Sequence, residues 1–445
     1  MDSDSVLGRI MASRPSAWTL RRLVLSADSP RDLLETLFVH YDVSSALGFR
    51  EGTAAAAEAI RVFPRAFDSP DIVCRALFKL SDFNDSENMG AKSLRACRDA
   101  LKAAVSAGDE FYEAQCLSRL GLFFKKYSSR PPVLKRLERE FARSGSFRDG
   151  MNARAAELFR ESAEIFGRLG HAYNHGVSIF NHALMLWACG RQEESYAAAA
   201  DARERADRAG SGALLAEILL HIANIHSDRR EFYMARTYYR ASIDLFRGDG
   251  NWPKASDVMH KMAWVFLMEG DSGSALSAYK KALDMKVSVD FMQARGDSMM
   301  GRGMSLRSVG SLRRAASCFA AAAPIFEAVR LSDYALLAKY FLYRTSVACG
   351  GEFSPLSLNS FMKSYRPGKV GLPVSPGLVY EKRAGDSDPI DRPFGMPPAR
   401  MRITRRNLHD VLRDASSVCW KRGDRLSSAF LSKKAGILAA YRDSC

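Results

Sequence analysis

The chain has 445 residues, 47% of them hydrophobic, and its 65 Lys and Arg against 50 Asp and Glu give a formal net charge of +15. This length fits two or three ordinary domains or one continuous repeat array, and no apolar run reaches the roughly 18 residues of a membrane helix. The eight cysteines form no C-x-x-C pair, and residues 1–14 lack the apolar core of a signal peptide. We therefore expect a soluble cytoplasmic protein with reduced thiols and no membrane insertion, whose basic excess suits nucleic acid, an acidic protein or a membrane surface.

The first 126 residues carry the sequence signs of several helices. Residues 1–30 are mixed in character and form a separate N-terminal segment. In residues 31–126 apolar side chains recur at helical spacing, and Ser69-Pro70 predicts a helix start, because Ser caps a helix and Pro fits its first turn. We interpret residues 31–126 as irregular helix pairs.

Residues 127–150 interrupt this pattern. They contain Pro131-Pro132 and a charged segment, and the partner helix that should follow Phe124 closely is expected to begin only near Asn152. We predict an insertion here, projecting from one face of a repeat array.

Between residues 151 and 350 one pattern returns every 40 residues. Its most visible part is a column of glycines in which Arg230 is the one exception. Small residues stand five and twelve positions after most column residues, an aromatic residue or alanine stands nine after, and a small residue stands seven before. Glycine accepts the left-handed backbone at a helix end, so the column predicts turns between paired helices, with further turns near Gly170, Gly210 and Gly250. The glycines of the column are Gly150, Gly190, Gly270, Gly310 and Gly350.

This pattern resembles the tetratricopeptide repeat, which places small and aromatic residues at the same intervals. The copy around Gly310 departs from the repeat at Arg302 and Leu306, and a second copy from Ala263 to Ala282 has alanine in place of the first glycine. The standard repeat has about 34 residues, so the 40-residue period is similar to the long-helix type found in LGN and rapsyn. The residues of the first copy that match in register are Gly303, Gly310, Ala315, Phe319 and Ala322.

The resemblance implies an all-α fold, a right-handed α-solenoid of helix pairs. It also implies a non-enzymatic adaptor or scaffold that binds a protein or peptide segment in its concave groove, in a cytoskeletal or other multiprotein assembly. The first helix of each pair lines that groove, and asparagines there would bond the backbone of an extended peptide. The groove residues carried over by register are Asn181, Leu184, Trp187, His221, Asn224, His260, Lys261, Trp264, Met300, Met304, Arg307 and Arg344.

The same residues could equally belong to the core between helices. Only Lys261, Arg307 and Arg344 are basic, and they are widely spaced, so the set departs from the chaperone-binding subgroup that clamps a terminal carboxylate.

The C-terminal fifth of the chain has another composition. Residues 351–403 are rich in proline and predict an extended basic linker, and residues 404–445 predict a helical hairpin. Residues 352–445 hold 17 Lys and Arg against 9 Asp and Glu, which is +8 of the total +15.

That basic tail supports an alternative hypothesis, RNA binding by the groove and the tail, because tyrosines between the basic residues suit stacking on bases. Charged tails are also common without such a role. A third hypothesis is that the proline-rich segment occupies the chain's own groove. The residues predicted to contact nucleic acid or an acidic partner are Arg366, Lys369, Lys382, Arg383, Arg400, Arg402, Arg405 and Arg406.

Motifs for catalysis are absent from the sequence. It contains no phosphate-binding G-x-x-x-x-G-K-[ST], no H-E-x-x-H and no G-x-S-x-G. His171 and His175 stand four apart but have no Cys or acidic residue at ligand spacing. We therefore predict no catalytic residues, no metal and no cofactor.

Overall fold

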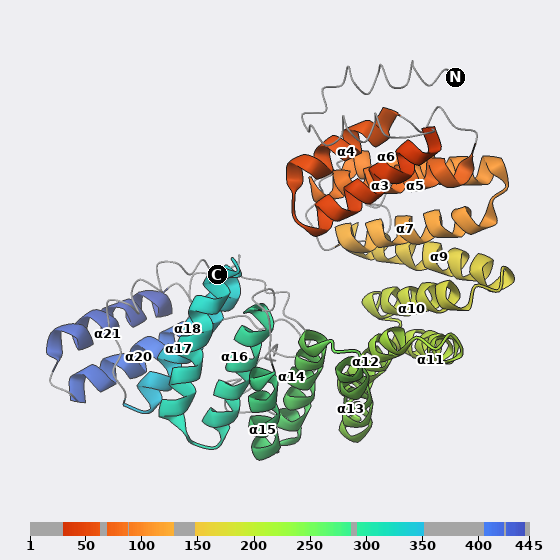
Figure 1. Cartoon of the computed structure of the whole chain (residues 1–445). Helices are drawn as coiled ribbons and strands as arrows, with labels where there is room; N and C mark the ends of the chain where they lie inside the picture. The colour runs from red at the N-terminus through yellow and green to blue at the C-terminus, as the bar shows by residue number, and fades with distance from the viewer. Residues whose placement is uncertain are drawn as a thin grey trace. The chain divides into compact units, whose positions relative to one another are not determined.

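The computed structural model describes residues 30–62, 69–87, 89–128, 147–285, 292–350, 405–421 and 424–440, and these residues are helical with no strand among them (Figure 1). None of the described helices is long and apolar enough to span a membrane. The chain divides into an N-terminal unit, residues 1–211, and a C-terminal unit, residues 212–445. The predicted all-α architecture of paired helices is confirmed.

The N-terminal unit contains four helix pairs, in which each described helix packs against the next along the chain. The insertion predicted at residues 127–150 falls mostly outside the described residues. The helices are α3 (Pro30–Ala46), α4 (Arg50–Val62), α5 (Pro70–Ser86), α6 (Gly90–Ala107), α7 (Glu110–Ser128), α9 (Phe147–Arg168), α10 (Ala172–Ala188) and α11 (Gln192–Arg208).

The C-terminal unit continues the same pairing and ends in the expected helical hairpin, whose first helix packs against α18. The predicted linker at residues 351–403 lies outside the described residues. The helices are α12 (Gly212–Asp228), α13 (Phe232–Gly248), α14 (Trp252–Glu269), α15 (Ser272–Asp284), α16 (Met292–Ser308), α17 (Leu312–Ala328), α18 (Ser332–Ala348), α20 (Arg405–Lys421) and α21 (Arg425–Ala440).

Most of the predicted turns have left-handed backbone. Gly190, Gly270, Gly310 and Gly350 have positive φ, and so do the glycines predicted half a period away. Arg230, the exception in the glycine column, adopts the same conformation with φ of 61°. The pairing of the helices therefore dictates this backbone even where the residue does not favour it.

Gly150 is a correction to the predicted column. It lies in the first turn of α9, which begins at Phe147 rather than near Asn152, and it is buried. Among the described residues the helix before α9 ends at Ser128, so Gly150 is not a turn that joins α7 to α9.

The small and aromatic columns form the contact between paired helices. Gly121 on α7 lies against the ring of Phe159 on α9, and Gly303 on α16 lies against the ring of Phe319 on α17. In both cases an added Cβ would come closer than 3 Å to the ring, so only glycine lets the ring approach the helix backbone. The two units therefore use the same packing between their paired helices.

Serine hydroxyls show that the C-terminal hairpin packs like a repeat. Ser195 Oγ donates to the carbonyl oxygen of Ala183 at 2.7 Å, joining α11 to α10 across twelve residues. Ser416 Oγ donates to the carbonyl oxygen of Ser428 at 2.9 Å, joining α20 to α21 across the same separation. We infer that α20 and α21 are one more helix pair of the array.

Candidate protein-binding face

The first helix of each pair carries three positions that lie on one helical face, at thirteen, nine and six residues before the turn column. We call this the first-helix face. In the N-terminal unit it is formed by α3, α5, α7 and α10. For α3, α5 and α7 the column positions are Gly48 and residues 88 and 128, which continue the 40-residue period. For α10 the column position is Gly190. In the C-terminal unit it is formed by α12, α14, α16 and α18. The resemblance to tetratricopeptide repeats implied that ligands bind on this side of the array.

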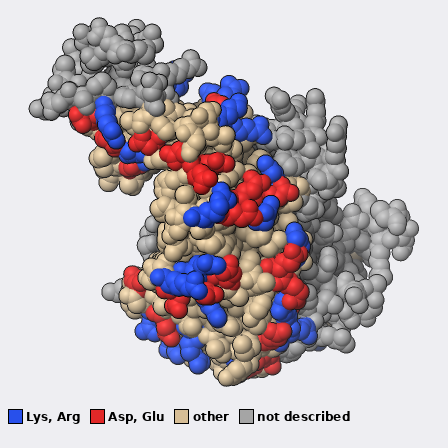
Figure 2. Space-filling view, turned by 90° about the vertical axis from the view of Figure 1, so that its right-hand side faces the viewer, with Lys and Arg blue, Asp and Glu red and all other residues tan. Residues whose placement is uncertain are grey.

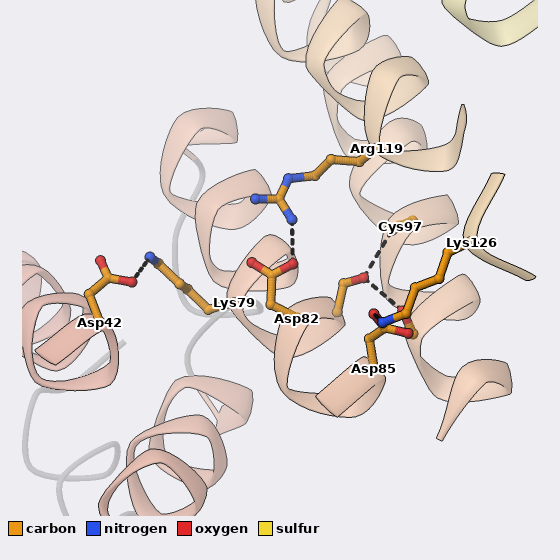
Figure 3. A network of polar contacts seen from close by, with 9 residues as sticks. Asp42, Lys79, Asp82, Asp85, Cys97, Arg119 and Lys126 are labelled. Atoms are coloured by element: carbon orange, nitrogen blue, oxygen red, sulfur yellow. Dashed lines mark hydrogen bonds and ion pairs between the residues drawn. The ribbon is translucent and has the colours of Figure 1, made fainter. Parts of the chain in front are cut away.

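In the N-terminal unit the first-helix face is a ladder of ion pairs between neighbouring repeats (Figure 3). Lys79 on α5 donates to Asp42 on α3, and Arg119 on α7 donates to Asp82 on α5 at 2.7 Å. Arg75 also donates to both carboxylate oxygens of Glu35, one of them at 2.7 Å.

The cations of this ladder also contact aromatic rings. The guanidinium of Arg75 lies 4.8 Å from the Phe38 ring centre, and that of Arg119 lies 4.4 Å from the Phe78 ring centre. The hydrogen bonds from Arg75 lower the pKa of Glu35 below its ordinary value. Each charge on this face therefore has a partner from the next repeat, which leaves little for a ligand to satisfy.

In the C-terminal unit the same positions hold different chemistry. Where the N-terminal unit has Asp42 and Asp82, six residues before the column, α14 and α16 have Trp264 and Met304. Both side chains are half-buried and pack against the two core clusters on either side of them. They leave apolar surface accessible on this face.

Next to this apolar surface lies a buried carboxyl group. Asp297 on α16 is 6% exposed, and its Oδ1 has no hydrogen-bond partner among the described residues. Burial raises the pKa of Asp297 to about 7, against the opposing effect of Lys261, and Asp257 adds to the rise. A buried carboxylate without a donor is costly, so this group is either protonated or open to a donor from outside.

The neighbours of Asp297 do not supply that donor. The Tyr279 hydroxyl is buried and also has no partner within the described chain, and its ring lies against Gly301, which leaves no room for a Cβ. The Nδ1 of His260 lies 3.2 Å from Ser298 Oγ, and burial lowers the pKa of His260 to about 4. His260 is therefore neutral near pH 7, and Lys261 pairs with Asp257 at 3.2 Å.

Several predicted groove residues have partners inside the protein. Asn224 Oδ1 accepts from the Tyr239 hydroxyl at 2.7 Å, and Arg307 donates to Thr345 Oγ1 at 3.1 Å. Arg344 pairs with Asp414 of α20 at 3.5 Å. In the N-terminal unit Lys125 Nζ lies 3.4 Å from Asn181 Oδ1.

Other predicted groove residues are interior. His221, His260 and Met300 are 3%, 6% and 1% exposed, so they pack between helices rather than present a side chain outward. Leu184 and Trp187 are half-buried, like Lys261 and Trp264. Ligand contact by these residues stays a prediction.

The basic residues predicted to contact nucleic acid lie outside the described residues, apart from Arg405 and Arg406 at the start of α20, whose side chains are not described. On the face that Figure 2 shows, Lys and Arg side chains lie interspersed with Asp and Glu. The described residues on that face therefore form no broad surface of one sign, which phosphate binding would favour.

Asp297 and Tyr279 were not among the predicted site residues. A signal for Asp297 was present in the sequence: Glu217, Asp257 and Asp297 stand 40 residues apart, each thirteen before a column residue. This acidic row follows the repeat period, but the sequence does not show which of its members lack a partner.

Comparison with known proteins supports the fold. Residues 214–286 match a family model described as tetratricopeptide repeat. A search of curated proteins gave no match. The chain is similar to a signal transduction ATPase with numerous domains from Pyrococcus horikoshii, which has a tetratricopeptide repeat sensor, with 16% identity, a TM-score of 0.50, and coverage of 75% of this chain and 49% of that one. This chain thus spans about half the length of that protein.

Two further structures are similar with lower scores. The apo form of RapI is 13% identical, with a TM-score of 0.48, and the match covers 79% of this chain and 99% of that one. The apo form of the quorum sensor NprR from B. thuringiensis is 12% identical, with a TM-score of 0.47 and coverage of 77% and 97%.

Proposed function

Residues 214–286 carry tetratricopeptide repeats, and from this premise we propose that the chain is a non-enzymatic scaffold that binds a segment of another protein on the first-helix face of α14 and α16. The observation that carries the proposal is that Trp264 and Met304 are half-buried apolar side chains at the repeat position where Asp42 and Asp82 pair with Lys79 and Arg119. At the same position α7 has the exposed Leu122. Half-buried aromatic and methionine side chains supply contact area that a partner can bury, whereas a surface ion pair gains little from being covered.

The proposal is narrower than binding along the whole array. The ladder on α3, α5 and α7 joins neighbouring repeats and is satisfied by its own residues. We therefore expect the main contacts of the partner on the C-terminal unit.

The test compares matched substitutions at one repeat position in the two units. Trp264→Gln combined with Met304→Gln removes the apolar surface of the C-terminal unit. Leu122→Gln is the control, because Leu122 stands six residues before residue 128 on α7 and is 47% exposed. Each full-length variant is used for quantitative affinity purification from the native source, with nuclease treatment and circular dichroism to check folding.

We expect the double variant to lose at least about fivefold in recovery of the main partner, which corresponds to about 1 kcal/mol, and Leu122→Gln to leave recovery unchanged. Equal recovery by a folded double variant would reject binding on this face. Recovery that depends on nuclease would support the RNA hypothesis instead. Increased recovery after deletion of residues 351–403 would indicate that this segment competes for the face.

A further inference from the structure

The acidic row on the first-helix face is paired at two of its three positions. Lys254 Nζ lies 2.7 Å from Glu217 Oε1, and Lys261 Nζ lies 3.2 Å from Asp257 Oδ2. Both lysines belong to α14. Asp297, the third member of the row, makes no hydrogen bond and no ion pair with the described residues. The row and the two lysines together leave one carboxyl group unpaired.

The repeat itself does not supply a cation for Asp297. In the N-terminal unit Glu35 takes its partner from the equivalent position of the next repeat, which is Arg75. The residue equivalent to Arg75 for Asp297 is Leu337, which is 1% exposed in the core. When Asp297 is ionised, a donor for it must therefore come from another part of the chain or from a ligand.

Asp297 is 6% exposed, so a ligand cation can contact only the small accessible part of its carboxyl group and would itself become largely buried there. The charged groups that face it are Lys261 and Asp257, which pair with each other, while His260 stays neutral above pH 5 because burial lowers its pKa to about 4. A charge-assisted hydrogen bond at a largely buried site is worth more than one at the surface. The half-buried Trp264 and Met304 lie on the same face and could cover an aliphatic side chain.

We propose that the bound segment places a lysine or arginine side chain against Asp297, with its aliphatic stem on Trp264 and Met304. This inference rests on the proposed function, because it assigns the chemistry of the partner at the same face. A cation is favoured over a neutral amide because the two lysines already pair with Glu217 and Asp257, so the negative charge of an ionised Asp297 is not balanced within the row.

The test uses full-length protein and synthetic 12-residue peptide pools, randomised except for a central lysine, arginine, glutamine or glutamate. We expect the wild-type protein to retain the lysine and arginine pools at least about tenfold better than the glutamine pool, which corresponds to about 1.4 kcal/mol. Asp297→Asn should reduce this preference to less than about twofold. Asp244→Asn, on the exposed side of α13, is the matched control and should keep the preference.

Equal retention of the lysine, arginine and glutamine pools by wild-type protein would overturn this inference. If the pools are retained equally but the Trp264→Gln/Met304→Gln variant retains all of them less well than wild type, this inference is wrong and the proposed function still holds. Retention that the double variant does not change would overturn both proposals.

A second measurement uses only wild-type protein and therefore does not depend on the folding of Asp297→Asn. Only the carboxylate form attracts a cation, so the affinity of wild-type protein for the lysine pool should rise by up to about tenfold from pH 6 to pH 8. An affinity that does not change over this range would also overturn the inference.

Discussion

The first-helix faces of the two units share one geometry and differ in chemistry. On α3, α5 and α7 the charged residues of this face pair between repeats, as Glu35 does with Arg75 and Asp82 with Arg119, while Leu122 is apolar and exposed. On α14 and α16 the same positions hold Trp264, Met304 and the unpaired Asp297. The charges on the N-terminal face are paired between repeats, whereas the C-terminal face leaves one carboxyl group unpaired among the described residues, on the same face as two half-buried apolar side chains.

The fold tolerates this difference because one side of each first helix packs against its paired helix and another side forms the first-helix face. The side that faces the paired helix uses small residues and aromatic rings in both units, as at Gly121 with Phe159 and Gly303 with Phe319. The exposed positions of the first-helix face, such as Asp42 and Leu122, lie outside that contact and can change without loss of the fold, whereas Leu337 on the same face is buried.

The largest effect that would sharpen the comparison is expected for Asp297→Asn. The pKa of Asp297 is about 7 in the folded protein against 3.8 for an exposed carboxyl group, so the folded state holds more protons between these values and the unfolding free energy falls as pH rises from 4 to 7. Asn removes this dependence. The stability of the variant relative to wild type should therefore rise by about 2–3 kcal/mol between pH 5 and pH 8.

Hydrogen exchange of α16 peptides measures this change locally, because a chain of two units need not unfold in one step. His260, whose pKa is lowered, has the opposite effect below pH 6.5, but it is present in both proteins and cancels in the difference. Glu35→Gln is the control in the N-terminal unit. Because Arg75 lowers the pKa of Glu35 from its ordinary 4.5, this substitution should reduce stability above pH 4.5, have less effect as the pH falls below that value, and not raise stability at pH 8. If the stability difference between Asp297→Asn and wild type does not change with pH, the pKa of Asp297 is not raised by burial.

The next effect tests whether the shared packing is equal in both units. Gly121→Ala and Gly303→Ala each place a methyl group against a phenylalanine ring, which must then move. We expect each to cost about 2 kcal/mol, as overpacking typically does, measured as lost protection of the helix pair concerned in hydrogen exchange. A cost in one unit only would show that the units differ in their cores as well as in their faces.

A smaller effect is expected at the turns. Arg230 has a φ of 61° in the column where Gly48 and Gly190 have 68° and 79°. Arg230→Gly should stabilise α12 and α13 by about 1 kcal/mol, because glycine adopts this backbone without the steric cost of a Cβ. Arg191→Gly, next to a glycine that already makes its turn, is the control and should give no gain. A lower melting temperature for Arg230→Gly would mean that the arginine side chain contributes more than its backbone costs.

The fold followed from the sequence because its determinants repeat. The 40-residue period, the glycines at positive φ and the small residues opposite aromatic rings each depend on local conformation or on one neighbouring helix. The turn predicted at Gly150 was wrong, because Gly150 lies in the first turn of α9. A glycine in the sequence does not by itself show whether it begins a helix or ends one.

The site followed from the sequence only in part. Register placed Trp264 and Met304 on the first-helix face, and both are half-buried there. It also placed His221, His260 and Met300 there, although the approach of neighbouring helices buries all three. The sequence did not predict Asp297 as a site residue. Whether its carboxyl group has a partner depends on distances to residues of α14 and α15, and the repeat period does not give those distances.

The smallest effect concerns the ladder itself. Because the side chains of Glu35 and Arg75 are 42% and 36% exposed, solvent screens their attraction, and a double-mutant cycle with Glu35→Gln and Arg75→Gln should give a coupling of about 0.5 kcal/mol that falls with added salt. The partner bound by wild-type protein should be recovered equally by both variants, since the ladder satisfies itself without a ligand. A strong coupling would still agree with the difference between the two faces, because it would mean that the N-terminal face is rigid. Loss of the partner from either variant would contradict that difference, because a face whose charges are paired between repeats would then also recognise a ligand.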